Sequence, residues 1–241
     1  MKQGLVVKST GSWYQVWVEE DQRIWESRTR GKFRLDGKKL TNPVAVGDEV
    51  LFSINDEDET GVIKKILPRR NYVVRQSPRK KHDLHLLASN IDQAMVIVTI
   101  IEPMLKQGFI DRFLLMTEPY NIPTTIVFNK ADLYEAPELG VYEHLQAIYE
   151  PLGYTMLLTS ALSGIGLEAL KRQLKDKITL LSGQSGVGKS SLVNSIQPQL
   201  DLKTGDISNH SGKGQHTTTF AEMLPLDFGG KPVEVGSQQW L

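Results

Sequence analysis

A glycine-rich segment near residue 185 has the residue types and spacing that bind nucleotide phosphates. It matches the pattern GxxxxGK[ST] and reads Gly183, Gln184, Ser185, Gly186, Val187, Gly188, Lys189, Ser190. Its glycines let backbone N–H groups surround phosphate oxygens at a helix N-terminus, Lys189 neutralises the β- and γ-phosphates, and Ser190 can ligate Mg²⁺. Chance produces such a match in roughly 1% of chains of this length. We therefore predict that residues 183 to 190, with Ser191, bind a nucleotide and that Lys189 is also catalytic.

A second motif, NKxD, follows an apolar run at 124–128 and consists of Asn129, Lys130, Ala131 and Asp132. A carboxylate at Asp132 can accept hydrogen bonds from N1–H and the exocyclic amine of guanine, whereas adenine presents an acceptor at N1. A short motif with Ser160 and Ala161 is placed to offer a backbone N–H to guanine O6. Each short motif is weak alone, but together they predict a guanine nucleotide site. A P-loop enzyme for another nucleotide, or one that transfers phosphate to a small molecule, is the alternative.

Downstream of the phosphate motif lies a glycine-containing loop that runs through His216 into three threonines, Thr217, Thr218 and Thr219. Switch loops of this kind close on Mg²⁺ and the γ-phosphate through a threonine hydroxyl. We expect one of the three threonines to join Ser190 as a Mg²⁺ ligand. An ordinary surface loop is the alternative.

The elements that must position these motifs follow from the apolar patterning. Residues 1–68 contain short strands with turn residues between them, which predicts a small β-barrel of OB or SH3-like type. From residue 90, strands expected at 93–101, 124–128, 155–158 and 178–181 alternate with helices expected at 109–119, 138–149, 167–174 and 191–197, which predicts an α/β sheet. Residues 69–89 have prolines, a charge run and no apolar periodicity. We therefore expect a barrel at 1–68, a basic linker at 69–89 and a nucleotide-binding domain at 90–241.

Charge is divided unequally between these parts, although Lys+Arg and Asp+Glu are both 28 in number. Residues 1–90 hold 17 basic and 12 acidic side chains, so a polyanionic partner is expected there. OB folds bind nucleic acid through one face and its loops. The RNA-binding candidates are Arg28, Arg30, Lys32, Arg34, Lys38, Lys39, Arg69, Arg70, Arg79, Lys80 and Lys81. A solvated charged face is the alternative, and Trp13, Trp17 and Trp25 are either stacking platforms or barrel core.

The absence of cysteine excludes a disulfide framework, a thiol nucleophile and a cysteine-ligated metal site within these 241 residues. The longest apolar stretch, at 94–101, is far shorter than the roughly 20 residues that span a bilayer. These features favour a soluble cytoplasmic protein, which we expect to be a monomer.

The order of the motifs indicates a circular permutation. Ras-like GTPases have the phosphate loop first, followed by switch I, DxxG, NKxD and SA, whereas here NKxD and SA precede the phosphate loop and the switch loop. The chain resembles the circularly permuted ribosome small-subunit biogenesis GTPases, the RsgA family, over nearly its whole length. Further matching segments are Val46-Gly47-Asp48, Asn90-Ile91-Asp92-Gln93, Asp111-Arg112-Phe113-Leu114 and the loop His216 to Thr219.

This resemblance implies GTP hydrolysis that is slow alone and faster on the 30S subunit, binding to 16S rRNA late in subunit maturation, and release of an assembly factor. It also implies that His216 helps to orient the attacking water, although a solvated loop histidine is equally compatible with the residues. A GTP-regulated rRNA-binding module with negligible hydrolysis remains the alternative.

The resemblance further implies a DTPG motif and a zinc domain with three cysteines and one histidine, and this sequence contains neither. We therefore expect GTP or GDP and Mg²⁺ as cofactors, zinc only if the native chain continues, and a G domain truncated near switch II. The segment 227–230 formally fits DxxG, but a hairpin turn is favoured there because DxxG would leave too few strands after the switch loop.

Overall fold

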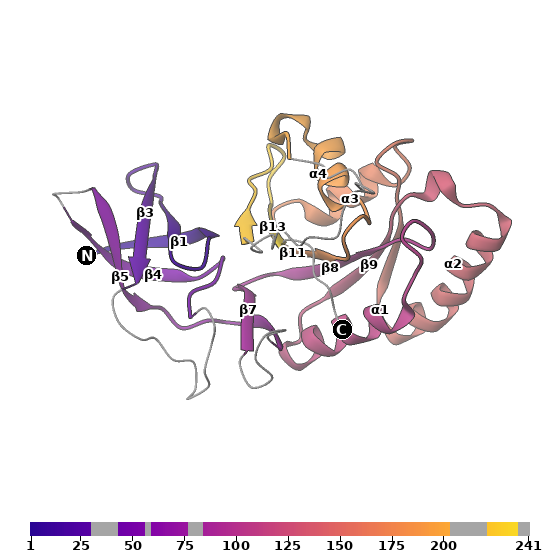
Figure 1. Ribbon diagram of the computed structural model, residues 1–241, viewed down its shortest axis with the longest axis horizontal. Helices are drawn as coiled ribbons and strands as arrows, with labels where there is room; N and C mark the ends of the chain where they lie inside the picture. The colour runs from indigo at the N-terminus through magenta and orange to yellow at the C-terminus, as the bar shows by residue number, and fades with distance from the viewer. Residues whose placement is uncertain (30–42, 56–58, 77–83, 203–220, 236–241) are drawn as a thin grey trace, which may run out of the picture.

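The computed structural model describes residues 1–29, 43–55, 59–76, 84–202 and 221–235 of the chain. Figure 1 shows a small barrel on the left and a larger α/β part on the right. None of the helices in these ranges combines the length and apolar character that crossing a bilayer requires.

Five strands form the barrel: β1 (Lys2–Ser9), β2 (Tyr14–Val18), β3 (Arg23–Thr29), β4 (Glu49–Asn55) and β5 (Thr60–Ile66). They lie in the order β1-β2-β3-β5-β4, and β4 pairs back with β1, which closes the sheet. The β3–β5 pair is parallel and the others are antiparallel. Alternate residues of β2, namely Tyr14, Val16 and Val18, point into the barrel core. The predicted OB-fold barrel is confirmed.

The second part is a six-stranded sheet in the order β10-β9-β8-β11-β13-β12. Its strands are β8 (Gln93–Val98), β9 (Thr124–Phe128), β10 (Thr155–Leu158), β11 (Ile178–Gly183), β12 (Ala221–Met223) and β13 (Lys231–Val235). All pairs are parallel except β12–β13, which is antiparallel. The α-helices are α1 (Gln107–Thr117), α2 (Ala136–Tyr149), α3 (Leu167–Leu174) and α4 (Lys189–Ile196), and the short 3₁₀ helices are η1 (Glu118–Tyr120), η2 (Ala131–Leu133), η3 (Glu150–Leu152) and η4 (Pro198–Leu200).

Buried side chains of β8 alternate between the two faces of this sheet. Ala94, Val96 and Val98 belong to one apolar cluster, and Met95 and Ile97 belong to the other. Helices α1 and α2 cover the first face and α3 and α4 cover the second, as Figure 1 shows. The near-continuous apolar sequence of β8 therefore reflects burial of the strand on both faces of the sheet, as in doubly wound α/β folds.

The predicted linker is partly wrong, because most of its described residues form two paired strands, β6 (Tyr72–Gln76) and β7 (Leu84–Ser89). Val73 and Leu87 are buried in the same cluster as the helices α1 and α2. The ring of Tyr72 lies against that of Tyr120, with 4.6 Å between centroids. This hairpin therefore packs as part of the α/β core.

Barrel and α/β sheet are joined by strand pairing. At the end of β1, Lys8 pairs with Glu222 and Ser9 with Ala221 of β12, and an ion pair of 3.0 Å joins Lys8 to Glu222. The described strands other than β6 and β7 therefore form one sheet.

The segment 227–230 is the turn of the β12–β13 hairpin, as favoured from the sequence. The N–H of Leu226 donates to the Gly230 carbonyl at 3.1 Å, and the N–H of Asp227 donates to Gln197 Oε1 at 2.8 Å. Gln197 follows the carboxyl end of α4, whereas the phosphate loop precedes its amino end. The DxxG interpretation of this segment is therefore wrong.

Candidate nucleotide site

Three loops meet at one edge of the α/β sheet. Strands β8, β9, β10 and β11 run parallel, so the segments after their carboxyl ends lie at the same edge. The phosphate motif follows β11, the NKxD motif follows β9, and the pair Ser160 and Ala161 follows β10. The structure thus brings the three predicted motifs together.

Lys189, the first residue of α4, is folded back over the phosphate loop. Its ammonium donates to the carbonyls of Gly183 and Gln184, at 3.1 Å each, and the residue is only 6% exposed. The cation is therefore held at the amino end of a helix, where phosphate oxygens are favoured.

Asn129 connects the base motif to the phosphate loop. Its side-chain amide donates to the Val187 carbonyl at 2.8 Å, and its carbonyl oxygen accepts from Thr159 Oγ1 at 3.3 Å. Gly188 must be glycine here, because its φ is +86° and a Cβ would lie 2.5 Å from Asn129 Nδ2. The relative position of the two loops is therefore set by one buried side chain.

Asp132 is exposed at the same edge, and the buried Ser160 orients it. Ser160 Oγ donates to Asp132 Oδ1 and accepts the backbone N–H groups of Leu162 and Ser163 at 3.2 and 3.0 Å. A carboxylate fixed in this way can accept paired hydrogen bonds from a guanine edge.

Tyr134, Ile100 and Glu102, which are not among the predicted site residues, support the NKxD loop. The Tyr134 hydroxyl donates to the Asn129 carbonyl at 2.7 Å and accepts from the N–H of Ile100 at 2.9 Å. Burial raises the pKa of Tyr134 to about 12, so its hydroxyl remains a donor. Lys130, with φ of +64°, donates to the Glu102 carbonyl at 2.5 Å. The contacts to Ile100 and Glu102 span 34 and 28 residues of sequence, so motif spacing gave no signal for them.

The predicted switch residues His216, Thr217, Thr218 and Thr219 lie outside the described residues. Ser190 is in the first turn of α4, immediately after Lys189. A hydroxyl oxygen is a donor that suits Mg²⁺, so the described part of the site is compatible with that ion.

Of the predicted RNA-binding residues, the structure describes three. Arg28 is exposed and lies 5.9 Å from the ring of Trp13, which is 40% exposed. The side chain of Arg70 is 52% exposed, whereas that of Arg69 is 6% exposed and pairs with Asp48. The assignment of Arg69 to RNA binding is therefore not supported, because its guanidinium is buried and paired with Asp48. Outside the described residues lie Arg30, Lys32, Arg34, Lys38, Lys39, Arg79, Lys80 and Lys81.

The three tryptophans divide between the two alternatives. Trp25 packs partly against the barrel core, and Arg23 lies 4.2 Å from its ring. Trp17 donates its indole N–H to Glu19 Oε2 at 2.9 Å. Because Trp13 is the most exposed of the three, it is the described tryptophan best placed to stack on a base.

Two family models match the chain: the RsgA N-terminal domain over residues 3–63 and the RsgA GTPase over 66–233. The proteins named small ribosomal subunit biogenesis GTPase RsgA from Christiangramia forsetii and Bacteroides fragilis are 47% and 46% identical to it, over 96% and 94% of this chain and 74% and 73% of theirs.

Solved structures agree with this match. The crystal structure of YjeQ from Thermotoga maritima has a TM-score of 0.69 and 37% identity, covering 96% of this chain and 73% of that one. A structure described as YloQ, a circularly permuted GTPase, has a TM-score of 0.61 and 27% identity, covering 97% and 70%. With the motif order, the barrel and the nucleotide loops in agreement, the chain belongs to the RsgA family of circularly permuted P-loop GTPases.

Proposed function

We propose that this GTPase binds the 30S ribosomal subunit through 16S rRNA, assists late maturation of the subunit in the cytoplasm, and hydrolyses GTP faster when bound to it. The observation that carries the nucleotide part is the meeting of Lys189, Asn129 and Asp132 at one sheet edge. The names of the curated relatives support the ribosomal part. Release of an assembly factor is a further part of this proposal.

Phosphoryl transfer to water depends on positioning and on neutralising charge. Lys189 supplies a cation at the phosphate loop, where phosphate oxygens would replace the carbonyls of Gly183 and Gln184 as its partners. Mg²⁺, when bound, neutralises phosphate charge, and Ser190 with one of Thr217, Thr218 and Thr219 is proposed to hold it. His216 is proposed to orient the attacking water, and Ala131, Ser160 and Ala161 to enclose the base.

The proposed RNA surface lies on the barrel and on the segment that follows it. Its described members are Arg28 and Arg70, and the remaining members are the basic residues at 30–39 and 79–81. Arginine beside an exposed aromatic ring, as at Arg28 and Trp13, can contact both phosphate and base. Phosphate contacts dominate such affinity, so binding should weaken steeply with salt.

Single-turnover GTP hydrolysis with and without purified 30S subunits tests the proposal. We expect a faster rate with subunits, and Lys189→Ala should abolish hydrolysis in both conditions because the phosphate cation is lost. Gln146→Ala, on the surface of α2, serves as a control that should behave like the parent. Equal rates near background would instead support the alternative, a GTP-regulated rRNA-binding module with negligible hydrolysis.

A further inference from the structure

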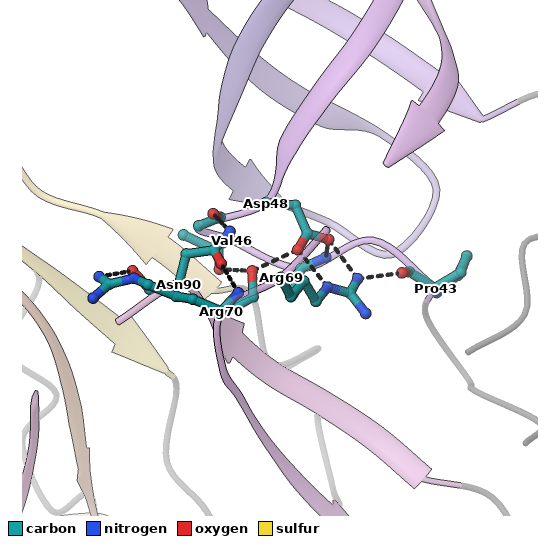
Figure 2. A network of polar contacts seen from close by, with 9 residues as sticks. Pro43, Val46, Asp48, Arg69, Arg70 and Asn90 are labelled. Carbon is teal, nitrogen blue, oxygen red and sulfur yellow. Dashed lines mark hydrogen bonds and ion pairs between the residues drawn. The ribbon is translucent and has the colours of Figure 1, made fainter. Parts of the chain in front are cut away.

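Two motifs that the nucleotide site does not use meet in space. The turn Val46-Gly47-Asp48 belongs to the barrel, whereas Ser89 is the last residue of β7 and Asn90 follows it at the start of the α/β part. Figure 2 shows the polar network between them, with Arg69 and Arg70 at its centre. The barrel and the α/β part therefore contact each other through specific side chains.

The barrel turn is bonded on both sides. Towards the barrel, the N–H of Gly47 donates to the Val6 carbonyl at 2.9 Å. Towards the α/β part, the Val46 carbonyl accepts the N–H of Ser89 at 3.0 Å, and the Gly47 carbonyl accepts Asn90 Nδ2 at 2.8 Å. A rotation of the barrel would break bonds on one side of this turn.

The last residue of the turn, Asp48, forms a buried ion pair. The carboxylate of Asp48 is fully buried and accepts Arg69 Nε and Nη2 at 2.6 Å each, Ser89 Oγ at 2.5 Å and the N–H of Ala45 at 2.9 Å. Arg69 also donates to the Pro43 carbonyl at 2.8 Å. Buried ion pairs with many hydrogen bonds give directional contacts, and breaking one leaves a buried charge without compensation.

Apolar packing accompanies these polar contacts. Val46 of the barrel turn lies in the same buried cluster as Val73 and Ile91, and Leu5 and Val7 of β1 pack against that cluster. Domains that meet only through small polar surfaces usually move relative to each other, whereas an apolar interface opposes such motion.

The contacts continue to the strand that carries the phosphate loop. Arg70 donates to the Asn90 carbonyl at 2.5 Å and to Asp92 Oδ1 at 2.7 Å. Asp92 Oδ2 accepts the N–H of Ile178 at 2.7 Å. Ile178 is the first residue of β11, and Gly183 at the other end of β11 begins the phosphate loop.

We propose that Gly47, Asp48, Arg69, Ser89 and Asn90 are positioning residues that fix the barrel in one orientation relative to the phosphate-loop strand. RNA bound to the barrel is then held at a set position relative to the nucleotide, as subunit stimulation of hydrolysis requires. The fixed orientation stands on the contacts alone, and its effect on stimulation rests on the proposed function.

A pair of glycine variants separates the junction contact from backbone strain. Gly47 and Gly11 both have positive φ, +94° and +91°, so alanine strains both positions. A Cβ at Gly47 would lie 2.0 Å from the Ser89 carbonyl oxygen across the junction, whereas a Cβ at Gly11 meets nothing within 4 Å. Gly47→Ala is the test and Gly11→Ala its control. Asp48→Asn is a second test, because it removes the charge of the buried ion pair. Its control is Glu59→Gln, which removes a charge from the exposed ion pair with Arg23.

The distance between the two parts is measured first. Because the 241-residue chain has no cysteine, spin labels can be placed at Glu20→Cys in the barrel and Ala147→Cys on α2, both exposed positions. Double electron–electron resonance should give one narrow distance distribution in the parent and in both controls, and a broadened distribution in Gly47→Ala and Asp48→Asn. A broad distribution in the parent, or a narrow one in either test variant that folds, overturns the fixed orientation.

Hydrolysis is measured on the same proteins without labels. The test variants should retain basal GTP hydrolysis and GDP affinity within about two-fold, while kcat at saturating 30S subunits falls about ten-fold, since misplacement of bound groups costs rate. Full stimulation in a variant with a broadened distribution overturns the link to hydrolysis. If the parent itself shows no stimulation, the proposed function fails, and the distance measurement still decides the orientation.

Discussion

One side chain, Asn129, bonds the base loop to the phosphate loop. The contact from Asn129 Nδ2 to the Val187 carbonyl is buried, and Asn129 is 1% exposed. In Asn129→Ala a buried carbonyl loses its partner, which costs roughly 1–3 kcal/mol, or about 5- to 150-fold in an equilibrium constant. We expect GDP affinity to fall within that range in a fluorescence titration. Gln146→Ala, which removes an exposed amide, should leave affinity unchanged, and an unchanged affinity in Asn129→Ala would contradict the role assigned to this contact.

We propose that Asp132 determines which purine the site accepts. Asp132→Asn exchanges an acceptor for a donor at the position proposed to face guanine N1–H and the exocyclic amine at N2. Xanthine carries a carbonyl in place of the exocyclic amine of guanine. The variant should therefore lose GDP affinity by about 100-fold or more and gain affinity for xanthosine diphosphate. Competition titrations with the two nucleotides measure the change. An unaltered preference for GDP would show that another group reads the base.

Residue types allowed the nucleotide loops to be predicted but not the role of Arg69. The GxxxxGK[ST] and NKxD motifs are short and local, so their function is visible in consecutive residues. Arg69 stands in a basic run, and its partner Asp48 is 21 residues away. The antiparallel pairing of β4 with β5, in which Val50 lies opposite Ile66, brings the two together. This long-range pairing is not visible in consecutive residues, which explains why the arginine was assigned to RNA from sequence.

Regular elements with clear apolar patterns were predicted well. Strands β9 and β10 and helix α3 have the expected bounds. Strand β1 was not predicted as a separate strand, since its half-buried positions mix polar and apolar residues. Its partners are residues 14–17, 49–52 and 221–222, all distant in sequence or beyond a turn. The β6–β7 hairpin was missed because each strand is short and the charge run lies between them.

The β6–β7 hairpin contains a histidine that should make folding stability depend on pH. Burial first, and then the charge of Arg75, lower the pKa of His85 from 6.5 to about 4. Between pH 6.5 and about 4 the unfolded chain binds a proton that the folded chain does not, so stability decreases as pH falls through this window. At 1.36 kcal/mol per unit, and allowing for partial exposure, the loss is about 2–3 kcal/mol.

Urea unfolding at pH 7.5, 5.5 and 4.5 measures this loss. His85→Gln should flatten the dependence relative to the parent, whereas His144→Gln, at an exposed position on α2, should follow the parent curve. If His85→Gln and the parent lose stability equally on acidification, the burial of His85 is not the cause.

Barrel and α/β part are joined by the β1–β12 pairing, by the apolar cluster around Val46 and by the buried pair of Asp48 and Arg69. These contacts involve β1 and the turn before β4 on one side and β12, β6 and β7 on the other. Separating the two parts would therefore expose apolar surface and a buried charge together. Such a molecule should unfold in one cooperative transition.

Three of the four tryptophans, Trp13, Trp17 and Trp25, are in the barrel, so fluorescence can report barrel unfolding separately from nucleotide binding. In a Trp240→Phe background, GDP at 100 times its Kd should stabilise the fluorescence transition by about 2.7 kcal/mol, because a ligand stabilises every part that unfolds with its site. The circular dichroism transition should shift equally, and ADP at the same concentration should shift neither. If GDP shifts circular dichroism but leaves barrel fluorescence unchanged, the two parts unfold independently and the junction does not couple them.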